Sequence, residues 1–269
     1  MHRRTIASAA LCFVLAATTC SACTCCAEAA ARSPEAADAN GVEAILSQLK
    51  QKTANLKSYQ AQVEYLFISH PLLESETLKK GALYYQKFGE KSKLRMNFQT
   101  LKEDDEKEQR YVEQFIFDGV WLTHVDYQVG NSERRQLAEP NEPVDVFDLA
   151  SKNLPVVGFT KIDELKKQFA ISLVEQEGTK AKDSIKLHLK AKPDSTYEDD
   201  YTSIDVWIDR KSYLPAKVVA VTTDGETHQI KLLKPRINQR IDNNTFDFKI
   251  PDGFSEQVVP LEKKTNRSN

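Results

Sequence analysis

The chain has 269 residues, with 37 basic and 39 acidic side chains and a formal net charge of −2. This balance, without a basic stripe interleaved with aromatic residues, argues against nucleic acid as a partner. The length is sufficient for one large β-rich domain with a core of its own.

The N-terminus has the features of a secretory signal peptide. Met1 to Arg4 carries positive charge, residues 5–19 form an apolar run, and Ala27-Glu28-Ala29 offers a small-x-small cleavage site. The apolar run is short for a membrane span, although a retained membrane anchor is the alternative. We therefore expect residues 1–29 to be removed and the mature protein to be exported.

The cysteines all precede this cleavage site, at Cys12, Cys20, Cys23, Cys25 and Cys26. A mature chain without thiols forms no disulfides, so its stability must come from its own core. The alternative is lipid attachment at Cys23, which follows Ser21-Ala22, although Cys20 replaces the aliphatic residue usual at that spacing. The cluster also resembles a metal or redox motif, which its place in a signal region argues against.

We expect the mature protein to begin near Ala30 and to contain no thiol, because the cleavage site follows a complete signal. Intact mass spectrometry of the exported protein checks this expectation. An N-terminus at Cys23 that carries acyl mass would show that lipidation occurs instead.

Residues 30–40 are small and polar and predict a flexible linker before a folded domain at residues 41–260. Val42, Ile45, Leu46, Leu49 and Leu56 recur at helical spacing, which predicts a helix over residues 42–56. Alternation of apolar and polar residues then predicts a sheet of about ten strands, drawn from eleven segments: residues 63–67, 81–87, 94–98, 111–118, 120–129, 169–175, 184–191, 203–209, 216–222, 228–233 and 246–250.

The segments between these strands read mainly as loops. The charge run at residues 101–110 is typical of a solvated loop, and residues 137–159 predict loops and short helices. Residues 163–169 predict one more short helix, and residues 261–269 a disordered tail. The fold class is therefore α+β, with a single curled antiparallel sheet, because open sheets of this size rarely stay flat.

The mature chain offers little to a catalyst. His70, His124, His188 and His228 are scattered singly, and the sequence has no nucleophile elbow, phosphate-binding glycine loop or dinucleotide fingerprint. The acidic stretch at residues 197–201 suits an acid/base pair or a calcium site, but its place between two strands favours a hairpin loop. We therefore expect a non-enzymatic protein without a cofactor or metal ion.

The apolar rows of the strands give the candidate ligand-binding residues. If these rows share one face, the helix covers only part of it, and the rest is either a packed core or an apolar cavity. The row Ile204, Val206 and Ile208 is expected to line this cavity with Leu187 and Leu189, while Trp207 and Asp209 face outward. The full set is Val63, Tyr65, Phe67, Leu83, Tyr85, Leu94, Met96, Phe98, Phe115, Phe117, Ile185, Leu187, Leu189, Ile204, Val206, Ile208, Ile230 and Leu232.

The C-terminal third contains an ordered set of short motifs: a strand that ends in Asp, a Leu-Pro, a Gly turn, an Asn after the next strand, and a final Phe-x-Phe-x-x-Pro-x-Gly. These features lie at Asp209, Leu214-Pro215, Asp224-Gly225, Asn238, Phe246, Phe248, Pro251 and Gly253. Together with the opening helix, residues 81–83 and Asp118-Gly119 upstream, this order resembles that of the LolA/LolB-like outer-membrane lipoprotein carrier and sorting proteins.

This resemblance implies an incomplete half-barrel lidded by helices, with a hydrophobic cavity for lipoprotein acyl chains. It also implies a monomeric, non-catalytic periplasmic carrier with donor and acceptor proteins at the inner and outer membranes. Where the family often has a lid-fastening Arg-Pro, this chain has Lys87-Phe88-Gly89, with Arg95 further on. A lysine lacks the planar fork of arginine, which leaves room for another lipid or peptide ligand. The alternative functions are a module that binds a protein partner and a hydrolase that uses residues 197–201.

Overall fold

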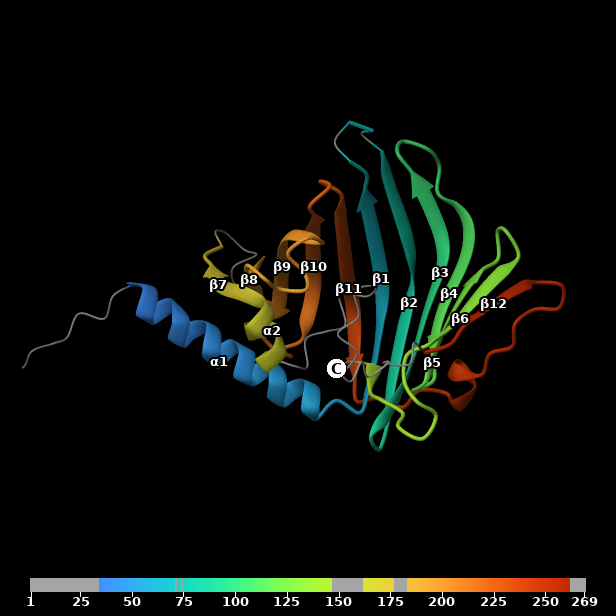
Figure 1. Cartoon of the computed structure of the whole chain (residues 1–269), viewed down its shortest axis with the longest axis horizontal. Coiled ribbons are helices and arrows are strands. Elements are labelled where there is room, and N and C mark those ends of the chain that lie inside the picture. Colours follow the sequence, from blue (N-terminus) through green and yellow to red (C-terminus); the bar gives the residue numbers. More distant parts are fainter. Residues whose placement is uncertain (1–33, 71, 74, 147–161, 177–182, 262–269) are drawn as a thin grey trace, which may run out of the picture. The chain divides into compact units, whose positions relative to one another are not determined.

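A computed structural model describes residues 34–261 except 71, 74, 147–161 and 177–182. The described residues form twelve strands in one sheet, with the helices α1 and α2 (Figure 1). Among them, no helix is both long and apolar enough to cross a membrane. The bounds are α1 Pro34–Ala54, β1 Ser58–Ile68, β2 Glu76–Phe88, β3 Lys91–Glu103, β4 Gln109–Phe117, β5 Trp121–Asp126, β6 Asn131–Gln136, α2 Ile162–Gln168, β7 Phe169–Val174, β8 Ser184–Ala191, β9 Tyr201–Asp209, β10 Pro215–Thr222, β11 Thr227–Ile237, the 3-10 helix η2 Asn243–Phe246 and β12 Ser255–Val259.

The sheet is open, with β12 at one edge and β7 at the other. Its order is β12-β6-β5-β4-β3-β2-β1-β11-β10-β9-β8-β7, and each pair is antiparallel except β12 with β6. The two arms of the sheet meet where β1 pairs with β11, so the first and last thirds of the chain are joined at its centre. This single curled sheet with helices confirms the predicted fold class, with more strands than the ten expected.

Helix α1 begins earlier than the sequence pattern predicts. It starts at Pro34, so residues 34–40, which we expected in a flexible linker, are helical. Proline suits the first turn of a helix because its missing N–H is not needed there, and the alanines that follow are strong helix formers. Val42, Leu46 and Leu49 form its buried stripe.

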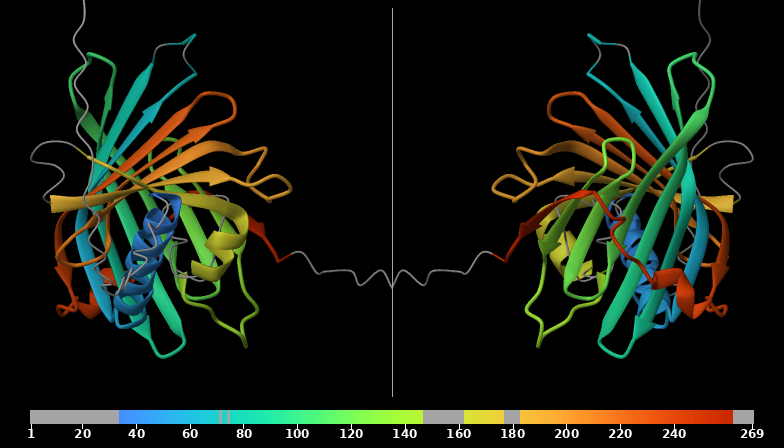
Figure 2. Two further views of the ribbon diagram at one scale, coloured as in Figure 1. Left: turned by 90° about the vertical axis from the view of Figure 1, so that its left-hand side faces the viewer. Right: turned by 90° about the vertical axis from the view of Figure 1, so that its right-hand side faces the viewer.

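The sheet curls around α1, which lies against one of its faces (Figure 2). We call this the inner face and the opposite one the outer face. The outer face carries the C-terminal segment that follows β11, where Ile241 and Phe246 are buried. Arg95 holds this segment, since its guanidinium donates to the carbonyl oxygens of Thr245 at 2.8 Å and Asp247 at 3.2 Å.

Two strand predictions are wrong. Residues 120–129 contain β5 and the start of a turn, in which Gly130 has a φ of 65°. The chain then returns as β6, which the apolar pattern did not predict because its sequence is polar. Residues 246–250 are not a strand: Phe246 ends η2, which Asp242 caps by accepting a hydrogen bond from the backbone N–H of Asn244, and residues 247–250 have no regular structure. The last strand is β12 instead. Beyond Leu261, the predicted tail lies outside the described residues, as do residues 147–159 of the predicted loop region.

A β-bulge in β3 sets the register near the centre of the sheet. Gly81 pairs with Phe98 and Lys80 with Thr100, so Gln99 is an extra residue relative to β2. Against β4 the irregularity is of the opposite kind, since Phe98 pairs with Glu113 and Thr100 with Arg110, which leaves two residues of β4 opposite Gln99. The bulge shifts the alternation of β3 by one residue, so Leu101 joins Phe98 on the inner face and is buried.

Candidate functional site: the inner face of the sheet

The strand register places all the candidate ligand-binding residues on the inner face. Across the sheet, Leu187 pairs with Val206, Val206 with Val218, and Val218 with Ile230. Ile230 pairs with Tyr65, which continues the same face onto β1. Trp207 takes the opposite face as predicted, where it lies between the ammonium groups of Lys186 and Lys217. The predicted apolar face is therefore continuous, while its role in binding stays a prediction.

The inner face is closed beneath α1. Here the candidate residues from β8 and β9 pack with α1 in one hydrophobic cluster, and Val206 and Ile208 are both 0% exposed. The row expected to line a cavity thus belongs to the packed core. The residues in this sector are Ile185, Leu187, Leu189, Ile204, Val206 and Ile208.

A larger side chain at Val206 distinguishes a packed core from an open cavity at this row. Replacing Val206 with tryptophan is expected to lower the free energy of unfolding by about 1–3 kcal/mol, because the larger side chain overpacks a closed core. Urea unfolding followed by circular dichroism measures this change. Unchanged stability would instead show that space for a ligand exists beside Val206.

The other arm of the inner face contains a half-buried sector. Its core residues Val63, Met96 and Phe98 are buried, and half-buried apolar side chains pack around them. Phe67 lies beside it on β1, with its ring 5.1 Å from that of His228. We define the half-buried sector as Tyr65, Phe67, Leu83, Phe115, Ile230 and Leu232; the remaining candidates Tyr85, Leu94 and Phe117 are buried in a neighbouring cluster.

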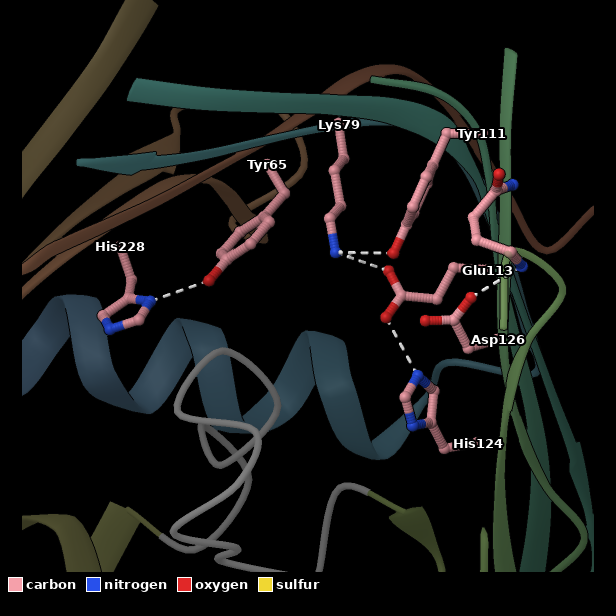
Figure 3. Close-up of polar contacts among 8 residues, drawn as sticks. Tyr65, Lys79, Tyr111, Glu113, His124, Asp126 and His228 are labelled. Atoms are coloured by element: carbon pink, nitrogen blue, oxygen red, sulfur yellow. Dashed lines mark hydrogen bonds and ion pairs between the residues drawn. The ribbon is translucent and has the colours of Figure 1, made fainter. Parts of the chain in front are cut away.

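A polar cluster lies on the inner face next to this sector (Figure 3). The ammonium of Lys79 on β2 donates to Glu113 Oε2 on β4 at 2.6 Å and to the hydroxyl of Tyr111 at 3.4 Å. The other carboxylate oxygen of Glu113 hydrogen-bonds His124 Nε2 on β5 at 2.9 Å. The His124 ring stacks on Phe115, with centroids 4.4 Å apart. Charged and apolar groups are thus in direct contact.

The cluster is largely withdrawn from water and remains charged. The side chains of Lys79 and Glu113 are 18% and 8% exposed. Burial opposes the charge on Glu113, but hydrogen bonds from His124 and Lys79 outweigh it and hold its pKa below the ordinary value. Burial likewise opposes the charge on Lys79, and the bond to Glu113 outweighs it, so the pKa of Lys79 is raised. At neutral pH the two groups form an ion pair.

A second polar pair borders the sector on β1 and β11. The hydroxyl of Tyr65 lies 2.8 Å from His228 Nδ1. Burial, followed by the negative charges of Glu113 and Glu226, raises the pKa of Tyr65 to about 12. Burial also lowers the pKa of His228, and Glu226 opposes this shift only in part. Tyr65 is therefore a neutral hydroxyl at physiological pH.

Acid is expected to weaken the fold through Glu113. Because its folded pKa lies below the ordinary value of about 4.3, its stabilising contribution is complete above about pH 5 and is lost as the pH falls through the folded pKa. Urea unfolding at about pH 7 and about pH 3.5 should show that the stability gap between wild type and Glu113→Gln narrows in acid. A gap that stays constant would contradict this assignment. Glu108→Gln is the comparison: hydrogen bonds from Lys80 and Thr100 also lower the pKa of Glu108, but its ion pair is exposed to water, so its gap should narrow in the same direction and by less.

The sequence pattern missed the polar cluster, although alternation contains the information. Lys79 has the same parity as Leu83 and Tyr85 in β2, and Glu113 has the same parity as Phe115 in β4. These charges were not predicted as part of the site because only the apolar members of each row were taken as candidates.

The acidic stretch at residues 197–201 forms turns and the start of β9, as predicted. No group of metal-binding side chains occurs in the described part of the chain.

Lys87 contacts the loop that follows β6. Its ammonium lies 3.2 Å from the buried carboxylate of Asp145, which also accepts a hydrogen bond from the Tyr85 hydroxyl at 2.9 Å. Ser92 Oγ accepts from the backbone N–H of Val146 at 2.7 Å. Lys87 therefore contacts this loop through an ion pair with Asp145.

The outer face carries a small cavity of about 200 Å³. Leu66 and Leu78 line it together with charged side chains from the neighbouring strands. Ligand pockets typically measure about 300–1,000 Å³ and are mainly apolar. This cavity is therefore smaller and more polar than a typical site for an apolar ligand.

No protein-family model and no curated protein matches the sequence. Among solved structures, an uncharacterized conserved protein from Thermus thermophilus matches with a TM-score of 0.47 and 12% identity, over 82% of this chain and 99% of that one. MucB, in the MucA/MucB complex of Pseudomonas aeruginosa, matches with a TM-score of 0.45 and 12% identity, over 78% of this chain and 61% of that one. A LolA superfamily protein from Nitrosomonas europaea matches with a TM-score of 0.33 and 13% identity, over 77% of this chain and 97% of that one. The solved structures that match therefore include a LolA superfamily protein, at low identity.

Proposed function

We propose that this chain is a non-catalytic periplasmic carrier that binds the acyl chain of a lipid or lipoprotein on the inner face of its sheet. The observation that carries the proposal is the half-buried sector, where aromatic and aliphatic side chains from β1, β2, β4 and β11 form one apolar surface. The rest of the inner face is closed by α1 and by packed loops. Among the described residues, the half-buried sector keeps its apolar side chains partly exposed and so retains contact area for a ligand.

An acyl chain suits this surface energetically. Each methylene removed from water contributes roughly 0.8 kcal/mol, so a chain of ordinary length binds well without directional contacts. The half-buried rings of Phe67 and Phe115 offer apolar area on two separate strands, although His124 stacks on one face of Phe115. Such binding is reversible, because a competing apolar site can take up the same chain.

Neighbouring residues on β1 provide a matched test. Phe67 faces inward and Leu66 faces outward, and both are half-buried. Phe67→Ser should weaken uptake of a fluorescent fatty-acid ester by at least tenfold, about 1.4 kcal/mol, whereas Leu66→Ser should leave uptake unchanged. Equal effects of the two variants, or no uptake by the wild-type protein, would overturn the proposal.

A second candidate function, binding of a protein partner, is favoured by the β1–β2 hairpin. Leu72 and Leu73 are 86% and 72% exposed at its tip. This hairpin is tied to the β3–β4 hairpin through Glu76 and Asp104, and residues 103–106 add an exposed acidic run. Apolar side chains beside an acidic rim suit a basic, amphipathic protein segment.

Native mass spectrometry of the protein isolated from the cell envelope separates the two candidates. A bound acyl lipid supports the carrier. A bound protein that is lost from a Leu72→Ser/Leu73→Ser variant supports the second function. The carrier is contradicted if the wild-type protein retains only a protein partner.

A further inference from the structure

The polar cluster on the inner face has hydrogen-bonding capacity that the described residues leave unused. A lysine ammonium has three N–H donors. Lys79 directs donors to Glu113 and Tyr111, and no further acceptor contacts it among the described residues. The ammonium lies 5.9 Å from the centroid of the Phe98 ring, which belongs to the core of the half-buried sector. A ligand on that sector therefore passes within reach of a lysine donor (Figure 3).

The cluster is poorly suited to an ionised head group. Lys79 and Glu113 neutralise each other as an ion pair at 2.6 Å. Asp126 adds a carboxylate from β5, and Glu226 lies 3.9 Å from His228 at the other side of the sector. An anionic ligand would approach the negative charges of Asp126 and Glu226, which repel it. A neutral oxygen acceptor meets no such penalty.

The ion pair is also an expensive feature on an apolar face. Partly buried charges lose hydration, and apolar side chains of similar size often stabilise a fold equally well or better. A matched pair, Lys80 with Glu108, joins the same two regions of the sheet on the outer face with the same 2.6 Å separation. Both of its side chains are 39% exposed, so that pair retains water. The inner pair therefore has a role that the outer pair does not require.

We propose that Lys79 donates a hydrogen bond to the carbonyl oxygen of an ester-linked acyl group, whose chain lies on the half-buried sector. The inference rests on the proposed carrier function and specifies its ligand as an acyl ester. Glu113 positions Lys79 and cancels its charge, and His124 holds Glu113 through its second carboxylate oxygen. The cluster thus selects a neutral acyl ester over the free acid.

Three pyrene-labelled probes of equal chain length test the inference: a methyl ester, the free acid and an alkane. The wild-type protein should bind the ester most tightly. Lys79→Met/Glu113→Gln removes both charges and should weaken ester binding about tenfold while alkane binding stays within twofold. Lys80→Met/Glu108→Gln is the matched outer-face control and should bind all probes as the wild type does.

The single variant Glu113→Gln should change affinity for the free acid in the opposite direction. It keeps the Lys79 donor and leaves its positive charge uncompensated, so affinity for the free acid should rise while the ester still binds. Tighter binding of the free acid than the ester by wild type, or unchanged ester binding by the inner double variant, overturns this inference and leaves the carrier function standing. If the wild-type protein binds none of the three probes, both this inference and the carrier function are overturned.

Discussion

Gly81→Ala is expected to lower the free energy of unfolding by at least about 3 kcal/mol, at the upper end of the usual range for overpacking. A Cβ atom at this position would lie 1.8 Å from the backbone oxygen of Asn97 and 2.8 Å from the Cα of Phe98. These are backbone atoms of β3, so relief of the clash requires β2 and β3 to separate. Gly81 adjoins the bulge that sets the inner-face register, so the damage should extend to ligand binding.

Gly41→Ala is the matched control for this prediction. Gly41 lies in α1, and a Cβ there would meet only Leu173 Cδ2 at an ordinary 3.9 Å. Alanine in a helix should therefore stabilise the protein by up to about 1 kcal/mol. Urea unfolding of both variants measures the opposite signs. A loss at Gly81 no greater than that from a typical surface substitution would refute the close approach of β2 and β3.

Lys79→Met should also be strongly destabilising, by about 3 kcal/mol at neutral pH. The substitution leaves the buried carboxylate of Glu113 without its ammonium, and an uncompensated buried charge is far more costly than a missing contact. His124 remains as a hydrogen-bonding partner at 2.9 Å. Adding Glu113→Gln should restore much of the lost stability, because the charge itself is then absent.

Lys80→Met measures the same chemistry on the outer face. Glu108, its partner, is well exposed, so water replaces the lost ammonium and the loss should stay under about 1 kcal/mol. Chemical unfolding of both single variants and the inner double variant completes the comparison. If Lys79→Met lowers the free energy of unfolding no more than Lys80→Met does, the buried charge of Glu113 does not depend on Lys79 for its compensation.

Alternation predicted most strands because each one has a single apolar face. The segment at Ser184–Ala191 was predicted to the residue, since Ile185, Leu187 and Leu189 alternate with polar neighbours. β6 and β12 were missed because pairing, and not apolar burial, defines them. Ser255 to Val259 is mostly exposed and is held through its parallel register with β6. Local sequence contains no information about such a partner.

The candidate site was predictable only in part. Parity placed Val206 and Phe115 on one face, but it did not tell which part of that face α1 covers. That distinction depends on contacts between segments far apart in the chain, since Leu46 of α1 packs with strands of the C-terminal arm. The bulge at Gln99 likewise depends on two neighbouring strands, and it decides that Leu101 faces inward.

Photolabelling tests most directly whether an acyl chain lies on the inner face. The mature protein would be incubated with an acyl ester that carries a diazirine on its chain, irradiated, and mapped by peptide mass spectrometry. We expect labels on the half-buried sector, at Phe67, Phe115 or Ile230, and competition by unlabelled ester. Labels at Leu66 or Leu78 in the outer-face cavity, or labelling that unlabelled ester does not reduce, would contradict an acyl-binding inner face.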